Sequence, residues 1–212
     1  MKYLYNIGCS FSEGNGIAED LGIDPVSEEG RELEAKSRYS AVLAKKLNLI
    51  EINEAQGGGS NQRIFRKTWN WIAENPKLLS ETIFVIQWSY PRRSEFYYSS
   101  TKKKWWWHTS YREVLEIKNL YFSDPKKGIH KLVLDMLNIS KTHPNYDSVG
   151  FIPNSTITSK TTLRYVLSLQ SFFKENNCKY LFFEGDRNMP EGCINWTSNL
   201  ANLVDKDYFI EE

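Results

Sequence analysis

The sequence predicts an α/β protein built on a parallel sheet with helices on both faces. Short apolar segments alternate with segments of helical periodicity, which is typical of consecutive strand–helix–strand units. The segment TIFVIQW at residues 82–88 is almost continuously apolar and rich in β-branched and aromatic residues, as expected of a buried central strand. The 212 residues are enough for one domain with its own core, so we expect residues 1–212 to form a single domain with an insertion at about 89–158.

The other strands are shorter than this central one. An apolar run at residues 3–7 ends at Gly8 and predicts a buried first strand. A second short strand is expected at 49–53, and the apolar segment KYLFF at 179–183 predicts a fourth. Four strands are therefore expected, in the chain order 3–7, 49–53, 82–88 and 179–183.

Helices are expected where apolar side chains recur along one helical face or where cap signals bound an apolar segment. The expected helices cover residues 31–47, the segment between the N-cap Ser60 and Pro76, residues 129–140 and residues 161–176. The segments expected to be loops or irregular are 12–30, 89–128 and 142–158. A last short helix is expected in the tail that begins at about Asn195.

Composition and charge limit the class of protein. Lysine plus arginine number 27 and aspartate plus glutamate 26, so a net charge of +1 gives no global reason to bind nucleic acid or an anionic membrane. No apolar run approaches the ~20 residues that span a bilayer, and the start of the chain lacks the apolar region of a secretory signal. Three widely separated cysteines indicate a reducing compartment without disulfides or a zinc site. We therefore expect a cytoplasmic protein without a metal or cofactor.

Polar turns follow the first three strands, at residues 8–13, 54–61 and 88–95. Ligands of parallel sheets bind outside the carboxyl ends of the strands, so we expect these turns to converge at one edge. In the first turn, Ser10 follows the buried strand and would present its hydroxyl and its own N–H to a cleft, which suits a nucleophile with one oxyanion donor. In a purely structural role, Ser10 would only cap or turn the chain.

The second turn contains three consecutive glycines, at 57–59, followed by Ser60 and Asn61. Glycine allows a bound group to approach the backbone closely, and N–H groups at the start of a helix favour an anion, including a developing oxyanion. The alternative is a flexible turn whose Asn61 belongs to the first turn of the following helix.

The sequence Gly8-Cys9-Ser10-Phe11 after a first strand, followed by an Asn-x-Ala-x-Gly-x-x-Ser-Asn segment at 53–61, resembles the SGNH/GDSL hydrolase superfamily, and in particular its divergent phage and environmental branch. The resemblance covers roughly the first 95 residues and the helix–strand unit at 160–184. It implies a three-layer, flavodoxin-like fold and a hydrolase with Ser10 as nucleophile. It also implies that the N–H of Gly57 or Gly58 contributes to the oxyanion hole.

Three parts of the family pattern differ in this chain. Cys9 stands where the family has aspartate, and segment 87–93 lacks the oxyanion asparagine, so Ser89 or Asn61 would replace it. The Asp-x-x-His block that supplies acid and base is absent, because the residues three before the histidines His108, His130 and His143 are Trp105, Lys127 and Ser140. The chain ends soon after the fourth strand, which leaves a truncated protein, a degenerate relative or a recruited histidine as explanations.

Two further residues are candidates for the site. His143, followed by Pro144 and near Asp147, would be the recruited base, although an exposed loop histidine is the commoner explanation. Arg92 follows the central strand and would bind a carboxylate or phosphate of the substrate. In a structural role it would pair with Glu95 and order the loop.

The run Lys-Lys-Lys-Trp-Trp-Trp-His at 102–108 has three interpretations. Its tryptophans would pack over the domain while the lysines face water, or the aromatic faces would stack on sugar rings or contact lipid. Basic residues beside aromatic ones also suit nucleic acid, but one short basic run in a near-neutral protein is weak support for that partner.

We therefore expect an SGNH-like serine hydrolase that acts on an ester, such as an acyl or acetyl group on a glycan. Ser10 would attack the carbonyl, while the N–H groups of Ser10 and of Gly57 or Gly58, with Asn61 or Ser89, would hold the oxyanion. The alternative is a catalytically inactive SGNH-fold protein that uses its Trp-rich insertion to bind a glycan or another partner.

Overall fold

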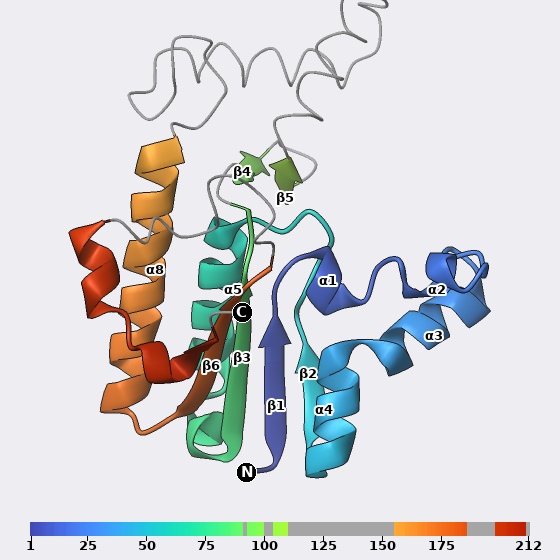
Figure 1. The fold of residues 1–212 in the computed structure, drawn as a ribbon, viewed down its shortest axis with the longest axis horizontal. Coiled ribbons are helices and arrows are strands. Elements are labelled where there is room, and N and C mark those ends of the chain that lie inside the picture. Colours follow the sequence, from blue (N-terminus) through green and yellow to red (C-terminus); the bar gives the residue numbers. More distant parts are fainter. Residues whose placement is uncertain (91–92, 100–103, 110–154, 186–197, 211–212) are drawn as a thin grey trace, which may run out of the picture.

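The structure, a computed structural model, describes residues 1–90, 93–99, 104–109, 155–185 and 198–210. Its main sheet has five strands, all parallel, in the order β2-β1-β3-β6-β7 (Figure 1). The strands are β1 (Tyr3–Ile7), β2 (Ile50–Asn53), β3 (Thr82–Trp88), β6 (Lys179–Glu184) and β7 (Phe209–Ile210). The expected α/β class and the four expected strands are confirmed. The fifth strand was missed because its two residues are too few to show an apolar pattern.

Helices and turns of helix connect these strands. The α-helices are α1 (Ser10–Glu13), α2 (Ile17–Asp20), α3 (Glu28–Ser37), α4 (Tyr39–Leu47), α5 (Asn61–Glu74) and α8 (Ser155–Glu175). The 3-10 helices are η1 (Pro76–Glu81), η2 (Asn199–Leu203) and η3 (Lys206–Tyr208). Within the part of the chain that the structure describes, no helix combines the length and the apolar character needed to cross a bilayer.

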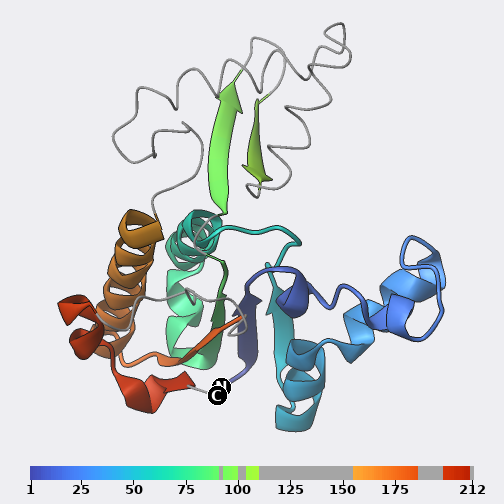
Figure 2. The same cartoon turned by 45° about the horizontal axis from the view of Figure 1, so that its top comes forward.

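The helices cover both faces of the main sheet (Figures 1 and 2). α5 and α8 pack against one face, and α4 packs against the other, over β1 and β2. Side chains alternate between the two faces along each strand, so Tyr5 and Ile7 join the core under α5 and α8, whereas Leu4 joins a smaller cluster with Ala44 and Val85 under α4. The protein therefore has three layers.

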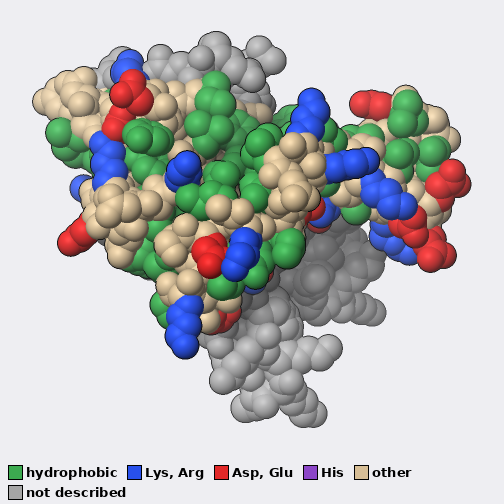
Figure 3. All heavy atoms as spheres, turned by 90° about the horizontal axis from the view of Figure 1, so that it is seen from below, with side chains coloured by type: hydrophobic (Ala, Val, Ile, Leu, Met, Phe, Trp, Pro, Cys, Tyr) green, Lys and Arg blue, Asp and Glu red, His purple; other side chains and the backbone are tan. Residues whose placement is uncertain are grey.

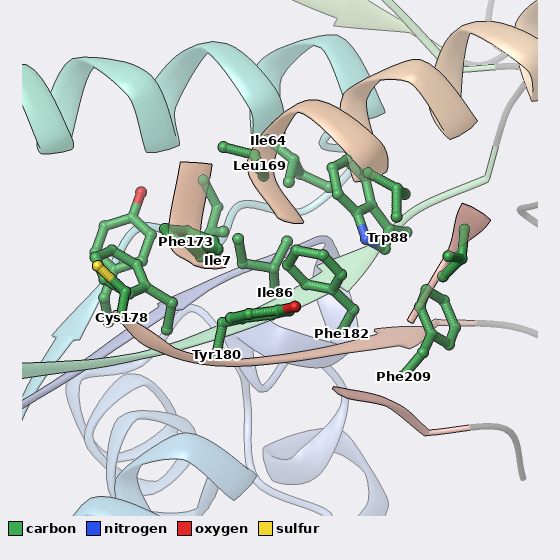
Figure 4. Packing of buried hydrophobic residues seen from close by; sticks show 14 of the residues in the cluster. Ile7, Ile64, Ile86, Trp88, Leu169, Phe173, Cys178, Tyr180, Phe182 and Phe209 are labelled. Atoms are coloured by element: carbon green, nitrogen blue, oxygen red, sulfur yellow. The ribbon is translucent and has the colours of Figure 1, made fainter. Parts of the chain in front are cut away.

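Aromatic side chains dominate the larger core (Figure 4). The rings of Phe84 and Phe173 stack with centroids 4.5 Å apart, and Trp88 meets Phe182 edge-on at 5.8 Å. Trp88 is the largest of the fully buried side chains. Burying each such side chain stabilises the fold by roughly 1.5–3 kcal/mol, so this cluster holds the carboxyl ends of β3 and β6 in fixed positions.

The expected single helix over 31–47 is wrong, because the structure divides it into α3 and α4 at Arg38. The ψ angle of Arg38 is 146°, outside the helical range, and its guanidinium donates to both carboxylate oxygens of Glu51 on β2, at 2.9 and 2.8 Å. Ser40 in α4 also donates to Glu51, at 2.5 Å. This contact between elements distant along the chain fixes the bend, which local periodicity does not reveal.

Two segments expected to lack regular structure contain some. Residues 12–30, expected to be a loop, contain the end of α1, all of α2 and the start of α3. Within 89–128, β4 (Ser94–Ser99) and β5 (Lys104–Thr109) pair antiparallel as a separate hairpin after β3. The helices were missed because α2 is short and α3 contains few apolar residues, which gives little periodic signal. The strands of the hairpin were missed because their aromatic residues are consecutive and do not alternate with polar ones. The helix expected at 129–140 lies outside the described residues.

The face of the sheet beside α4 is incompletely covered. An open pocket of about 380 Å³ lies there, lined by Tyr39, Leu43, Val85, Leu181, Phe183, Glu184 and Ile210. Seen from below, hydrophobic side chains gather across the middle of the molecule, while acidic and basic side chains crowd the arm formed by α2 and α3 (Figure 3). α4 thus covers β1 and β2, while apolar side chains of β6 and β7 line the open pocket beside it.

The ionisation of Tyr180 at alkaline pH tests whether this residue is buried in the core as the structure describes. Its side chain is 5% exposed, its hydroxyl has no hydrogen-bond partner in the described part of the chain, and burial raises its pKa to about 12. Because an unfolded tyrosine has a pKa of about 10, the stability associated with protonated Tyr180 is complete below about pH 10 and is lost as the pH rises toward about 12.

We predict that Tyr180→Phe reduces this alkaline loss of stability and changes the free energy of unfolding near pH 7 by less than about 1 kcal/mol, because no hydrogen bond is removed. Urea denaturation at about pH 7 and about pH 11 would measure both effects. An alkaline loss as large as that of the unmodified protein would contradict this account of Tyr180.

Candidate functional site

The turns after β1 and β2 lie against each other at the carboxyl edge of the sheet (Figure 1). The N–H of Gln56 donates to the carbonyl oxygen of Gly8 at 3.3 Å, and the N–H of Glu54 donates to the carbonyl oxygen of Asn6 at 2.8 Å. A Cβ atom at Gly59 would lie 3.1 Å from that same Gly8 oxygen, closer than nearly all real contacts. The glycines therefore allow the two turns to meet, as the sequence predicts.

Ser10 is the first residue of α1 and is half-buried. Neither its hydroxyl nor its backbone N–H has a hydrogen-bond partner among the residues that the structure describes. The next serine is different, since Ser12 is fully buried and donates to Gln87 at 2.6 Å. Of these two serines, Ser10 is the one with a hydroxyl available to a ligand.

The side-chain amide of Gln87, at the end of β3, holds the turn that carries Ser10. Its oxygen accepts from the Ser12 hydroxyl at 2.6 Å and from the Cys9 N–H at 3.4 Å. Glycines make room for this side chain, because a Cβ at Gly8 would lie 2.7 Å from the Gln87 oxygen and a Cβ at Gly185 would lie 2.8 Å from its nitrogen. The buried polar side chain of Gln87 thus fills the space between the ends of β1 and β6.

A second polar network ties β1 and β2 to α4. Asn6 donates to the side-chain oxygen of Asn53 at 2.7 Å and accepts from the Tyr39 hydroxyl at 2.5 Å. The Tyr39 hydroxyl also lies 2.9 Å from that of Ser12, which joins this network to Gln87. Burial raises the pKa of Tyr39, so its hydroxyl keeps its proton at neutral pH and can act as a donor.

In the turn that contains the three glycines at 57–59, here called the glycine turn, one backbone N–H is hydrogen-bonded to a side chain and another has no partner within the described residues. The N–H of Gly57 donates to the carboxylate of Glu13, at the end of α1, with a donor–acceptor distance of 2.5 Å. Gly58 has a φ of +74°, which favours glycine, and its N–H has no partner within the described residues. The turn ends at Ser60, whose hydroxyl caps α5 by accepting from the Arg63 N–H at 3.2 Å. The expected N-cap is confirmed.

Asn61 and Ser89 are bonded to each other in the interior. Asn61 is 4% exposed and Ser89 is 1% exposed. The Asn61 side chain accepts from the Ser89 N–H at 2.7 Å and donates to the Ser89 carbonyl at 2.8 Å and to Thr162 at 3.0 Å. The Ser89 hydroxyl accepts from Arg93 at 3.0 Å. These two residues therefore join α5 and α8 to the chain just after β3.

Two of the expected site residues, Arg92 and His143, lie outside the described residues. The same is true of His130, and for His108 the structure describes the backbone of β5 alone. The candidate general base His143 is thus not among the residues that the structure describes.

Sequence reasoning missed the residues that hold the site together, namely Asn6, Glu13, Tyr39 and Gln87. Two of them carried a usable signal, because Asn6 and Gln87 are polar residues within otherwise apolar strands. A buried amide is expected to be hydrogen-bonded, so its presence in a central strand indicates a polar network at that end of the sheet. Glu13 carried no such signal.

Comparison with known protein families gives a match that carries no activity. Residues 16–116 match a family model described as a family of unknown function (DUF6071). The matched segment begins after Ser10 and extends through the glycine turn and Gln87. No curated protein matches the chain.

We predict that Gln87→Leu lowers the free energy of unfolding by about 1–3 kcal/mol, because it removes the acceptor shared by the buried Ser12 hydroxyl and the Cys9 N–H. Hydrogen–deuterium exchange of the amides at 8–13 should become faster. Gln170→Leu is the matched control, since the buried Gln170 side chain also joins two elements, donating to the Leu203 carbonyl at 3.0 Å and accepting from the Asp205 N–H at 2.7 Å. Equal exchange at 8–13 in both variants would contradict the role assigned to Gln87.

Proposed function

We propose that this protein is an SGNH-like serine hydrolase that cleaves an ester, with Ser10 as its nucleophile. One observation carries the proposal: the Ser10 hydroxyl has no partner among the described residues and lies at the carboxyl edge, where the glycine turn meets the turn that carries Ser10. A serine hydroxyl and unpartnered backbone N–H groups on two adjoining turns are among the elements that acyl transfer requires.

In the proposed reaction, the Ser10 oxygen attacks the ester carbonyl while its proton passes to a base. The N–H groups of Ser10 and Gly58 stabilise the oxyanion, because Asn61 already uses its side-chain N–H groups within the core. Collapse of the tetrahedral intermediate releases the alcohol with a proton and leaves the acyl group on Ser10. Water then cleaves this second ester and restores the serine. His143 remains the candidate base, and Arg92 the candidate contact to the substrate.

A catalytically inactive SGNH-like binding protein is the second candidate, and a specific contact favours it. The Glu13 carboxylate, hydrogen-bonded to the Gly57 N–H, puts a negative charge beside the glycine turn that the hydrolase reaction would use. The sequence also lacks an Asp-x-x-His block. In this case the site would hold a ligand without reaction, and the Trp-rich insertion would contact a glycan or another partner.

A fluorophosphonate probe distinguishes the two candidates. We predict covalent labelling of the native protein at Ser10, and a loss of labelling by more than about 100-fold in Ser10→Ala, because the probe reports an activated serine. Ser37→Ala, at the exposed end of α3, is the control and should label like the unmodified protein. If the native protein is not labelled, the hydrolase proposal fails and the binding protein is favoured.

A further inference from the structure

Glu13 makes a contact that has no role in the hydrolase chemistry proposed above. Its carboxylate accepts a hydrogen bond from the backbone N–H of Gly57 at 2.5 Å, shorter than the usual range for such a bond. A Cβ atom at Gly57 would lie 3.1 Å from this carboxylate oxygen and 2.8 Å from the side-chain nitrogen of Asn15. Glycine at this position therefore lets the acidic side chain reach the turn.

This contact occupies one of the two glycine N–H groups that the sequence resemblance offers as oxyanion donors. The resemblance implies the N–H of Gly57 or of Gly58 as an oxyanion donor, and the N–H of Gly57 is hydrogen-bonded to the Glu13 carboxylate. Glu13 lies in the same turn of helix as Ser10, three residues later, so the carboxylate belongs to the element that presents the nucleophile. An oxyanion forming beside it would meet a like charge, which costs free energy in a half-buried site.

We propose that Glu13 is an intramolecular occupant of the oxyanion region that restrains the reactivity of Ser10 until its carboxylate moves away. This inference rests on the proposed function, because it concerns regulation of the same site. Once the carboxylate leaves the Gly57 N–H, an oxyanion held by the N–H groups of Ser10 and Gly58 would form without a like charge beside it.

The connection after α1 suits such a movement. Gly14, which ends α1, and Gly16 both have positive φ, at +97° and +94°, so the chain turns sharply just after Glu13. The N–H of Gly16 is held by the carboxylate of Glu34 in α3, at 3.0 Å. Two glutamates thus make the same kind of bond to a glycine N–H in this region, but only that of Glu13 involves the glycine turn beside Ser10.

The pair Glu13 and Glu34 therefore allows a matched experiment. Glu13→Gln keeps a neutral acceptor for the Gly57 N–H and removes the charge, whereas Glu13→Ala removes both. Glu34→Gln and Glu34→Ala make the same changes at the Gly16 N–H. The measurements are the rate of fluorophosphonate labelling at Ser10 and hydrogen–deuterium exchange of the Gly57 amide, with Ser10→Ala as the background.

We expect Glu13→Gln and Glu13→Ala to increase the labelling rate by about 10-fold or more, because a like charge next to the developing oxyanion is removed. Exchange of the Gly57 amide should become faster in Glu13→Ala. The Glu34 variants should label at the rate of the unmodified protein and keep the Gly57 amide protected.

Three results would overturn the inference, and they have different meanings. Labelling that is unchanged in both Glu13 variants means that the contact does not restrain Ser10. Labelling that falls to the Ser10→Ala background in Glu13→Gln means that the carboxylate assists the serine as a base. If no variant is labelled, including the unmodified protein, the proposed function fails and the inference with it. Gly57 exchange then still shows whether the contact forms in solution.

Discussion

The buried amide of Gln87 is the interaction on which the carboxyl edge of this sheet depends. It lies where three parallel strands end, between two glycines that leave space for it, and it bonds to the turn that carries Ser10. A buried amide without partners would cost roughly 1–3 kcal/mol, so the turn is held in the arrangement that satisfies Gln87. The position of the candidate nucleophile therefore follows from a residue that makes no contact with a substrate in the proposed reaction.

The carboxyl edge has a tightly packed core beneath it and polar groups that remain available to a ligand. Beneath it, Trp88 and its aromatic neighbours fill the core, and Asn61 and Ser89 join three elements through their own hydrogen bonds. Above it, the Ser10 hydroxyl and the Gly58 N–H have no partners within the described residues. Functional groups carried on short turns and positioned by a packed scaffold are the usual arrangement in α/β proteins.

Much of the fold could be predicted from the sequence, and less of the site. Strands such as β3 and the N-cap Ser60 depend on patterns within a few residues, and both are present as expected. The bend at Arg38 and the contact of Glu13 with Gly57 depend on partners 13 and 44 residues away along the chain. Nothing in the local pattern around Arg38 or Glu13 indicates such a partner, which is why both were missed.

The sequence by itself determined the α/β class, the buried parallel strands and the convergence of a serine turn with a glycine turn, because apolar periodicity and glycine placement are local properties. The tertiary structure alone decided which polar groups are hydrogen-bonded within the protein and which stay available to a ligand. It paired Asn61 with Ser89 and the Gly57 N–H with Glu13, and it left the Ser10 hydroxyl without a partner among the described residues. Hydrogen bonds of this kind depend on distances between separate elements, and those distances are set only when the whole sheet and its helices pack.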